Sequence, residues 1–435
     1  MSLNPLAQAA NQAIQADCPV VHDLLSGIGK ALFFPKGILT QSAEAKTKAT
    51  RFNATIGTAT EGGQAMYIDC IHSQFNGLAP DDLYPYAPSP GLPALREAWA
   101  AKQREETPSM GAQATSLPVV TNALTHALDL VGELFLDPGD EVLMPDQLWG
   151  NYRLTWGVKR QAKLSTFAFF NDDLSGFNQA AFEAALAERA GGKVMVILNF
   201  PNNPTGYSPT RDEAAKIVAA LSAAAAAGTK IIAVCDDAYY GMFYADDCET
   251  ESLFGRLAGA HENLLAVKVD GATKEIFVWG LRVGFITFGV KNGTEAMYQA
   301  LEQKTGGAIR GAVSNITRPG QTIVLNGIKD PNFRAQQAEK IAILRERADE
   351  VQRVVYQEQY ADCWDVYPFN AGYFMCLRIK GVDAEQLRLY LLDEHGIGTI
   401  SLGSTDLRVA FSCCEKGDLA ELFDRVAQSV RALQG

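Results

Sequence analysis

The sequence lacks an excess of positive charge, a long apolar run and a signal peptide. Its 50 acidic residues outnumber 38 basic ones, which gives a formal net charge of −12. A surface of that sign repels phosphate backbones, so we expect no nucleic-acid partner. Nowhere do about 18 apolar residues follow one another, and residues 1–17 lack a basic start and a continuous apolar stretch. We therefore expect a soluble cytoplasmic protein that has no membrane partner.

Patterns typical of metal sites and disulfides are also missing. The eight cysteines are scattered without a CxxC pair, and the five histidines form no HExxH motif. Scattered cysteines are typical of free thiols in a reducing compartment. Without a cluster of ligands, we expect no catalytic metal.

Short apolar runs alternate with helical patterns between about residues 115 and 290. Such runs are typical of strands buried on both faces of a mostly parallel α/β sheet. In such a sheet, functional groups gather at the carboxyl ends of the strands. The runs are LPVV before Thr121, EVLMP from Glu141, KVMVILNF from Lys193, KIIAVCDD from Lys230, LLAVKVD from Leu264 and VGFITFG from Val283.

The pattern changes after about residue 325. A long amphipathic segment is followed by short apolar runs, YFMCLRI and LRVAF, and by a closing helical pattern, which is an α+β arrangement. At 435 residues the chain fits one large domain and a smaller one. We predict an N-terminal arm and part of the small domain over 1–65, a large α/β domain whose central sheet is flanked by helices over 66–322, and the rest of the small domain over 323–435.

Three polar residues follow buried runs in this region. Asn199 begins NFPNNPTG, Asp236 begins DDAYYG, and Lys274 lies just after AVKVDGA. Arg282 follows the lysine by eight residues. A single polar residue at such a position is usually part of a turn. Their joint occurrence at strand ends predicts one functional site.

These motifs together resemble the class I aminotransferases of the fold-type I pyridoxal 5'-phosphate enzymes, most closely the aspartate and aromatic aminotransferase group. The resemblance extends from about Asn53 to the C-terminus. It implies that Lys274 holds the cofactor as a Schiff base and moves a proton during catalysis. It also implies that Asp236 keeps the pyridine nitrogen protonated, while Asn203 and Tyr239 stabilise the ring oxygen.

The resemblance assigns the cofactor phosphate to Arg282 and to the helix that begins at Ala123, Leu124 and Thr125. This chain departs from the family there. Family members often have Ser-Gly or Gly at Ala123 and Leu124, and a serine at the position of Gly271. Backbone donors can still bind a phosphate, but fewer hydroxyl groups predict weaker retention.

Two aromatic residues follow from the same resemblance. Trp149 matches a tryptophan that stacks on the cofactor ring. Tyr152 replaces a histidine that contacts the cofactor's aspartate in aspartate aminotransferases, so that contact must differ here. Asp237 lies on the opposite strand face from Asp236 by the alternation of side chains, and we expect it to face away from the ring.

The substrate contacts are implied by the resemblance in the same way. Arg408 matches the arginine that binds the α-carboxylate, and Gly57 and Asn203 also match positions near the substrate. Arg310 matches an arginine that reaches into the neighbouring subunit to bind a side-chain carboxylate. Tyr86 matches a tyrosine that crosses the interface to the partner's phosphate. We therefore expect a homodimer with composite sites.

The resemblance predicts transfer of an amino group between an amino acid, aspartate/glutamate-like or aromatic, and a 2-oxo acid such as 2-oxoglutarate. A lyase, synthase or decarboxylase on the same scaffold is the alternative, because the cofactor motifs do not determine which bond breaks. A non-catalytic transcription regulator that binds the cofactor is a second alternative. It would need a basic DNA-binding module, which the residues before Asn53 do not provide.

Overall fold

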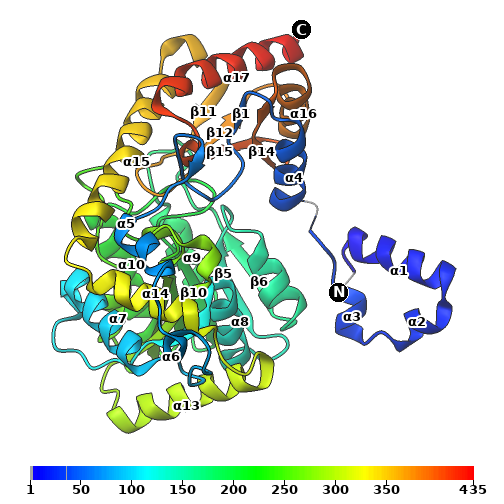
Figure 1. The fold of residues 1–435 in the computed structure, drawn as a ribbon. Helices are drawn as coiled ribbons and strands as arrows, with labels where there is room; N and C mark the ends of the chain where they lie inside the picture. The colour runs from blue at the N-terminus through cyan, green and yellow to red at the C-terminus, as the bar shows by residue number, and fades with distance from the viewer. Residues whose placement is uncertain (1–2, 36) are drawn as a thin grey trace.

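A seven-stranded sheet lies at the centre of the larger part of the molecule in the computed structural model, which describes residues 3–35 and 37–435 (Figure 1). Its strand order is β4-β10-β9-β8-β7-β5-β6. Strand β10 runs antiparallel to both neighbours, and every other adjacent pair is parallel. The predicted mostly parallel α/β sheet is confirmed. The strands are β4 Val119–Asn122, β5 Glu141–Pro145, β6 Lys163–Phe167, β7 Lys193–Asn199, β8 Lys230–Asp236, β9 Leu264–Gly271 and β10 Val283–Val290.

Helices cover both faces of this sheet and form a separate hydrophobic cluster with each. In β8, Ile232 and Val234 belong to one cluster, and Ile231, Ala233 and Cys235 belong to the other. Alternating strand residues point to opposite faces, so a strand with two covered faces is apolar throughout. The helices of this part are α5 Asp69–His72, α6 Pro80–Leu83, α7 Pro93–Glu106, α8 Ala123–Phe135, α9 Gln179–Ala187, α10 Arg211–Ala226, α11 Phe254–Leu257, α12 Ala272–Glu275, α13 Glu295–Ala312 and α14 Arg318–Lys329.

The smaller part is built on a four-stranded antiparallel sheet with the order β11-β12-β15-β14. Both ends of the chain contribute to it, because β1 pairs in parallel with β13, and α4 contacts β13 and β14. A short hairpin of β2 Thr60–Glu61 and β3 Gln64–Ala65 follows β1. The other elements are α4 Ile38–Lys48, β1 Phe52–Asn53, α15 Phe333–Val355, β11 Trp364–Val366, β12 Met375–Ile379, α16 Ala384–His395, β13 Ile397–Gly398, β14 Ile400–Leu402, β15 Asp406–Val409 and α17 Leu419–Gln434.

Three N-terminal helices form an arm that stands apart from the rest of the chain (Figure 1). They are α1 Pro5–Asp17, α2 Pro19–Leu24 and α3 Gly27–Ala31. Helix α1 contacts both of the others, and the side-chain amide of Asn11 donates to the carbonyl of Lys30 at 2.9 Å. No helix within residues 3–35 and 37–435 is long and apolar enough to cross a membrane. The domain boundaries at 65 and 322 stay predictions.

Candidate active site

A cavity of about 240 Å³ opens where β4, β7, β8 and β9 end and β10 begins. Polar groups from strands far apart in sequence meet there, as expected for the carboxyl edge of a parallel sheet. The cavity brings together most of the cofactor-binding residues predicted from the sequence. Those residues are Ala123, Leu124, Thr125, Trp149, Asn203, Asp236, Tyr239, Lys274 and Arg282.

Lys274 lies in the short helix α12, directly after β9. Its Nζ is 5.1 Å from the ring centroid of Tyr239. Burial lowers the pKa of Lys274 to about 8, although the carboxylate of Asp236 acts in the opposite direction. Its backbone carbonyl accepts a hydrogen bond from the hydroxyl of Tyr373 at 3.0 Å. A lysine with this pKa provides far more neutral amine near pH 8 than an exposed lysine does.

Asp236 is the last residue of β8, and its two carboxylate oxygens have different surroundings. The hydroxyl of Tyr152 donates to Oδ2 at 2.5 Å, whereas Oδ1 is buried and has no hydrogen-bond partner among the described residues. Burial raises the pKa of Asp236 to about 6. Asp237 instead forms an ion pair with Lys268 and accepts from the Ser252 hydroxyl at 2.6 Å. Of these two aspartates, Asp236 lines the cavity and Asp237 does not.

Tyr152 is held by aromatic packing. Its ring stacks on Trp156 at 5.2 Å between centroids with an interplanar angle of 7°, and it meets Trp149 edge-on at 5.5 Å. Burial and the neighbouring carboxylate of Asp236 raise the pKa of Tyr152 far above its ordinary value. It is a permanent donor to Asp236, which is the contact that the sequence left open.

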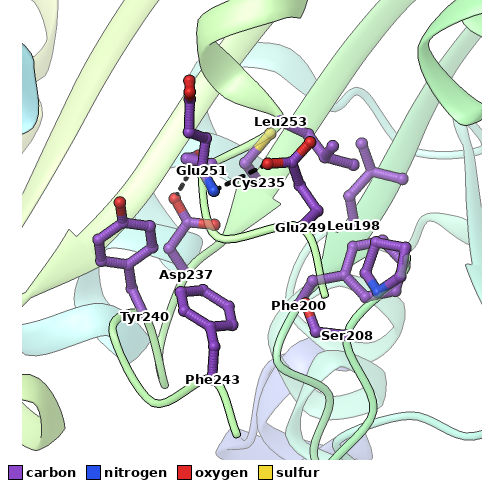
Figure 2. A pocket seen from close by; sticks show the side chains of 12 residues that line it. Leu198, Phe200, Ser208, Cys235, Asp237, Tyr240, Phe243, Glu249, Glu251 and Leu253 are labelled. Atoms are coloured by element: carbon purple, nitrogen blue, oxygen red, sulfur yellow. Dashed lines mark hydrogen bonds between the residues drawn. The ribbon is translucent and has the colours of Figure 1, made fainter. Parts of the chain in front are cut away.

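A second, much smaller cavity lies beside the end of β8. Figure 2 shows Cys235, Asp237, Tyr240 and Glu249 around it. Its volume of about 10 Å³ leaves room for one water molecule at most. A substrate does not fit there, so this smaller cavity is not a candidate active site.

The anion-binding end of the larger cavity combines a helix N-terminus with an arginine. Helix α8 begins at Ala123, so the first backbone N–H groups of the helix have no intrahelical partner. Arg282 also lines the cavity, and its Nη1 donates to the carbonyl of Trp279 at 3.1 Å. Partial positive charge and a guanidinium group are suited to a phosphate.

Gly271 occupies the position where family members often have a serine, and packing explains the difference. A Cβ atom on Gly271 would lie 2.8 Å from both the Cα of Gly284 and the carbonyl oxygen of Val283. Contacts that short force the backbone to shift. The close approach of β9 to β10 therefore excludes a side chain at this position.

Arg408 lies in β15 with its guanidinium carbon 4.2 Å from the ring centroid of Phe374. Its Nη1 donates to Oδ1 of Asn203 at 3.1 Å, and Nη2 donates to the carbonyl of Thr55 at 2.8 Å. Its buried Nε has no partner among the described residues. A Cβ atom on Gly57 would lie 3.5 Å from the Tyr239 hydroxyl, so this backbone also borders the site.

The structure does not bring Tyr86 and Arg310 to the cavity of their own chain. The side chain of Tyr86 is 88% exposed. Arg310 is exposed in the last turn of α13, where Nη1 donates to Oγ of Ser314 at 2.7 Å. A role for either residue in catalysis requires a second subunit and stays a prediction.

Three further described residues line the cavity that the sequence did not single out: Ala238, Thr273 and Trp279. Thr273 and Trp279 lie in the segment between β9 and Arg282. Their positions next to Lys274 and Arg282 in the sequence could have marked them as candidates for the cavity lining. Asn199 supports the site, because its Nδ2 donates to the carbonyl of Asp236 at 3.0 Å.

These groups fit pyridoxal phosphate. The unpartnered oxygen of Asp236 suits a protonated ring nitrogen, and the neutral amine of Lys274 suits an aldehyde carbon. The start of α8 and Arg282 suit the phosphate. The ring nitrogen, the aldehyde and the phosphate of the cofactor thus each have a complementary group in one cavity.

Comparison with known proteins supports the same assignment. The sequence model of the family described as aminotransferase class I and II matches residues 52–426. An aspartate/prephenate aminotransferase of Thermus thermophilus is 30% identical over 225 residues, which are 51% of this chain and 52% of that protein. A probable aspartate/prephenate aminotransferase of Aquifex aeolicus is 27% identical over 252 residues, 57% of each chain. The chain thus spans about half the length of these curated relatives.

Solved structures share the fold over nearly the whole chain. An aminotransferase from Anaerococcus prevotii has a TM-score of 0.83 at 21% identity and covers 94% of this chain and 99% of its own. The aspartate aminotransferase from Thermus thermophilus with maleate has a TM-score of 0.74 at 19% identity, and the match covers 93% of this chain and 99% of that one. Because the family match extends over most of the sequence, this chain belongs to the class I and II aminotransferase family.

Proposed function

We propose that this protein is a pyridoxal-phosphate-dependent aminotransferase that moves an amino group between an amino acid and a 2-oxo acid. One observation carries the proposal. Lys274, with its lowered pKa, and the free Oδ1 of Asp236 border one cavity, which also contains Arg282 and the start of α8. A cation-binding oxygen, an amine and an anion site in one cavity match the three reactive ends of the cofactor.

The bound cofactor supplies an electron sink for negative charge at the substrate's α-carbon. Lys274 acts as the base that takes the α-proton and later returns it. Asp236 keeps its negative charge near the ring nitrogen and so favours the protonated ring. Tyr239 donates from its hydroxyl group to the ring oxygen. Asn203 can do so from its amide NH₂, because its Oδ1 already accepts from Arg408.

Substrate selection rests on two arginines with different duties. Arg408 binds the α-carboxylate that all amino acids share, and its unpartnered Nε provides the free donor. Arg310 of a second subunit binds a side-chain carboxylate. We propose aspartate/glutamate-like or aromatic amino acids as donors, with 2-oxoglutarate as an acceptor, and a homodimer in which Tyr86 also crosses the interface.

A half-reaction tests this function. Purified holoenzyme is mixed with one amino acid at a time and no 2-oxo acid, and the cofactor absorbance is followed. An aminotransferase converts its cofactor to the pyridoxamine form and stops after one turnover. A lyase or decarboxylase continues to turn over without that conversion, and this result would reject the proposal in favour of the alternative.

Chemical labelling tests the role of the lysine independently. Borohydride reduction of the holoenzyme followed by peptide mapping should attach the cofactor to Lys274. Lys268 is the matched control, because it is buried nearby but paired with Asp237. A label on Lys268 would overturn the assignment. Lys274→Ala should abolish transamination and leave a folded protein.

A further inference from the structure

Two donors in the segment before Arg282 have no partner among the described residues. Oγ1 of Thr273 and Nε1 of Trp279 are both buried, and both residues line the larger cavity. Buried polar groups in folded proteins almost always have a hydrogen-bond partner, because leaving one unsatisfied is costly. Orphaned donors at a cavity wall therefore indicate a ligand that accepts from them.

The indole of Trp279 is fixed in place. Its ring packs against Phe277 at 5.8 Å between centroids and against Tyr373 at 6.5 Å. Its backbone carbonyl accepts from Nη1 of Arg282 at 3.1 Å. The N–H of an indole donates and never accepts, so the group it binds must present a lone pair.

The position within the site identifies the acceptor. The described residues that line this cavity include Arg282 and the first residues of α8, but not the substrate arginine Arg408. Arg282 donates from Nη1 to the backbone carbonyl of Trp279 at 3.1 Å, so the indole belongs to a residue at the end of the cavity that contains this guanidinium group. An anionic oxygen at that end is the partner that this set of donors recognises.

We propose that Nε1 of Trp279 donates a hydrogen bond to a phosphate oxygen of the bound cofactor, which makes Trp279 a cofactor-binding residue. The inference rests on the proposed function, because it assumes pyridoxal phosphate as the ligand. It resolves a difficulty in the sequence. Gly271 cannot hold the serine hydroxyl that relatives often place at this end, and the indole N–H supplies a donor there.

The test compares pyridoxal phosphate with pyridoxal, which has no phosphate. Apoenzyme is titrated with each compound, and the dissociation constant is read from cofactor absorbance. A hydrogen bond to a charged group predicts that Trp279→Phe weakens pyridoxal phosphate binding about ten- to a hundredfold. Pyridoxal binding should stay within about twofold, because the aromatic ring remains.

Trp149→Phe is the matched control, because Trp149 lines the same cavity and is predicted to stack on the cofactor ring. It should weaken both compounds by a similar factor. If Trp279→Phe weakens both compounds equally, or weakens neither, the indole N–H does not bind the phosphate and the inference fails. If wild-type apoenzyme binds neither compound, the proposed function fails instead.

A measurement on the wild-type protein adds a test whose negative result does not depend on the folding of a variant. Inorganic phosphate added to apoenzyme should shift one ¹⁵N indole resonance, the one that is missing from Trp279→Phe. If phosphate shifts no indole resonance in the wild-type spectrum, the inference is overturned whether or not the variant folds.

Discussion

In Asp236 and Lys274, burial brings the pKa values of a carboxyl group and an amine closer to neutral pH. Burial raises the pKa of the carboxyl group to about 6 and lowers the pKa of the amine to about 8, since each group loses hydration of its charged form. Between these values the carboxylate is largely ionised and the amine is largely protonated. A rise in pH toward 8 therefore increases the reactive amine without loss of the carboxylate.

The rate at which apoenzyme captures pyridoxal phosphate should rise as the pH increases through about 8. Only the neutral amine attacks an aldehyde, and lowering the pKa from 10.5 brings that rise down to about 8. Stopped-flow absorbance at a series of pH values measures it. Asp236→Asn removes the carboxylate that raises the lysine's pKa, so the rise should move to lower pH. A midpoint near 10.5 in the wild-type enzyme would contradict this account.

Tyr152→Phe should lower kcat and move the acidic limb of its pH profile to higher pH. The phenol stabilises the ionised form of Asp236, so its removal raises the pKa of that carboxyl group. We expect a loss of about 2 kcal/mol of transition-state stabilisation with little change in KM.

Tyr207→Phe is the control for that substitution. Its hydroxyl donates to Oε2 of Glu213 at 2.6 Å, outside the cavity. Tyr207→Phe should lower the free energy of unfolding and leave kcat and its pH profile unchanged. If the two variants behave alike in kinetics, Tyr152 acts only on stability.

The cavity residues that could be predicted from the sequence share one property: each belongs to a recognisable short motif. Lys274, Asp236 and Arg282 each lie at a fixed distance from a strand end, so pattern and resemblance found them. Trp279 was missed because the lack of a partner for its buried indole N–H is evident only in the folded chain. That property belongs to the folded packing and not to the local sequence.

At the scale of elements, the six apolar runs of the sequence all became strands, because each is covered on both faces. Strand β6 was not predicted. It lies at the edge of the sheet, and only Phe167 among its residues is buried. An edge strand with mixed burial has no continuous apolar run, so its sequence carries a weak signal.

Gly271→Ser should destabilise the protein without tightening cofactor binding, although the change recreates the family's serine. The new Cβ would meet the backbone of β10 at 2.8 Å, and such overpacking costs about 1–3 kcal/mol. Urea unfolding of the apoenzyme measures the free energy of unfolding, and titration with pyridoxal phosphate measures affinity.

Gly280→Ser is the matched control in the same segment. A Cβ atom on Gly280 would meet nothing within 4 Å, so this variant should keep wild-type stability. Equal stability of Gly271→Ser and the wild type would show that β9 and β10 can separate to accept a side chain.

At the scale of the whole molecule, two predicted site residues lie on the surface and not in the cavity of their own chain. Tyr86 and Arg310 are exposed and do not line the described cavity. Single-chain sequence patterns cannot place a residue relative to a partner's cavity, so the resemblance alone suggested these roles. A complementation experiment addresses the expected dimer directly.

Mixed dimers of Lys274→Ala and Arg310→Ala should recover activity toward dicarboxylic amino acids. In a composite site, one hybrid site carries both changes and the other carries neither. The purified hybrid should therefore have about half of the wild-type activity, and an unsorted mixture with random pairing should have about a quarter. Co-expression with two affinity tags isolates the hybrid, and a steady-state assay with aspartate measures it. No recovery would show that Arg310 does not act across an interface.

The pairing of β1 with β13 has a consequence for synthesis on the ribosome. Phe52 lies beside Ile397, so about 340 residues must be made after β1 before its partner strand exists. The seven-stranded sheet uses only residues between 119 and 290, so all its strands are complete before that point. Nascent chains should therefore form the cofactor-binding sheet first and close the smaller part around it last, which makes the C-terminal strands the final step in biogenesis.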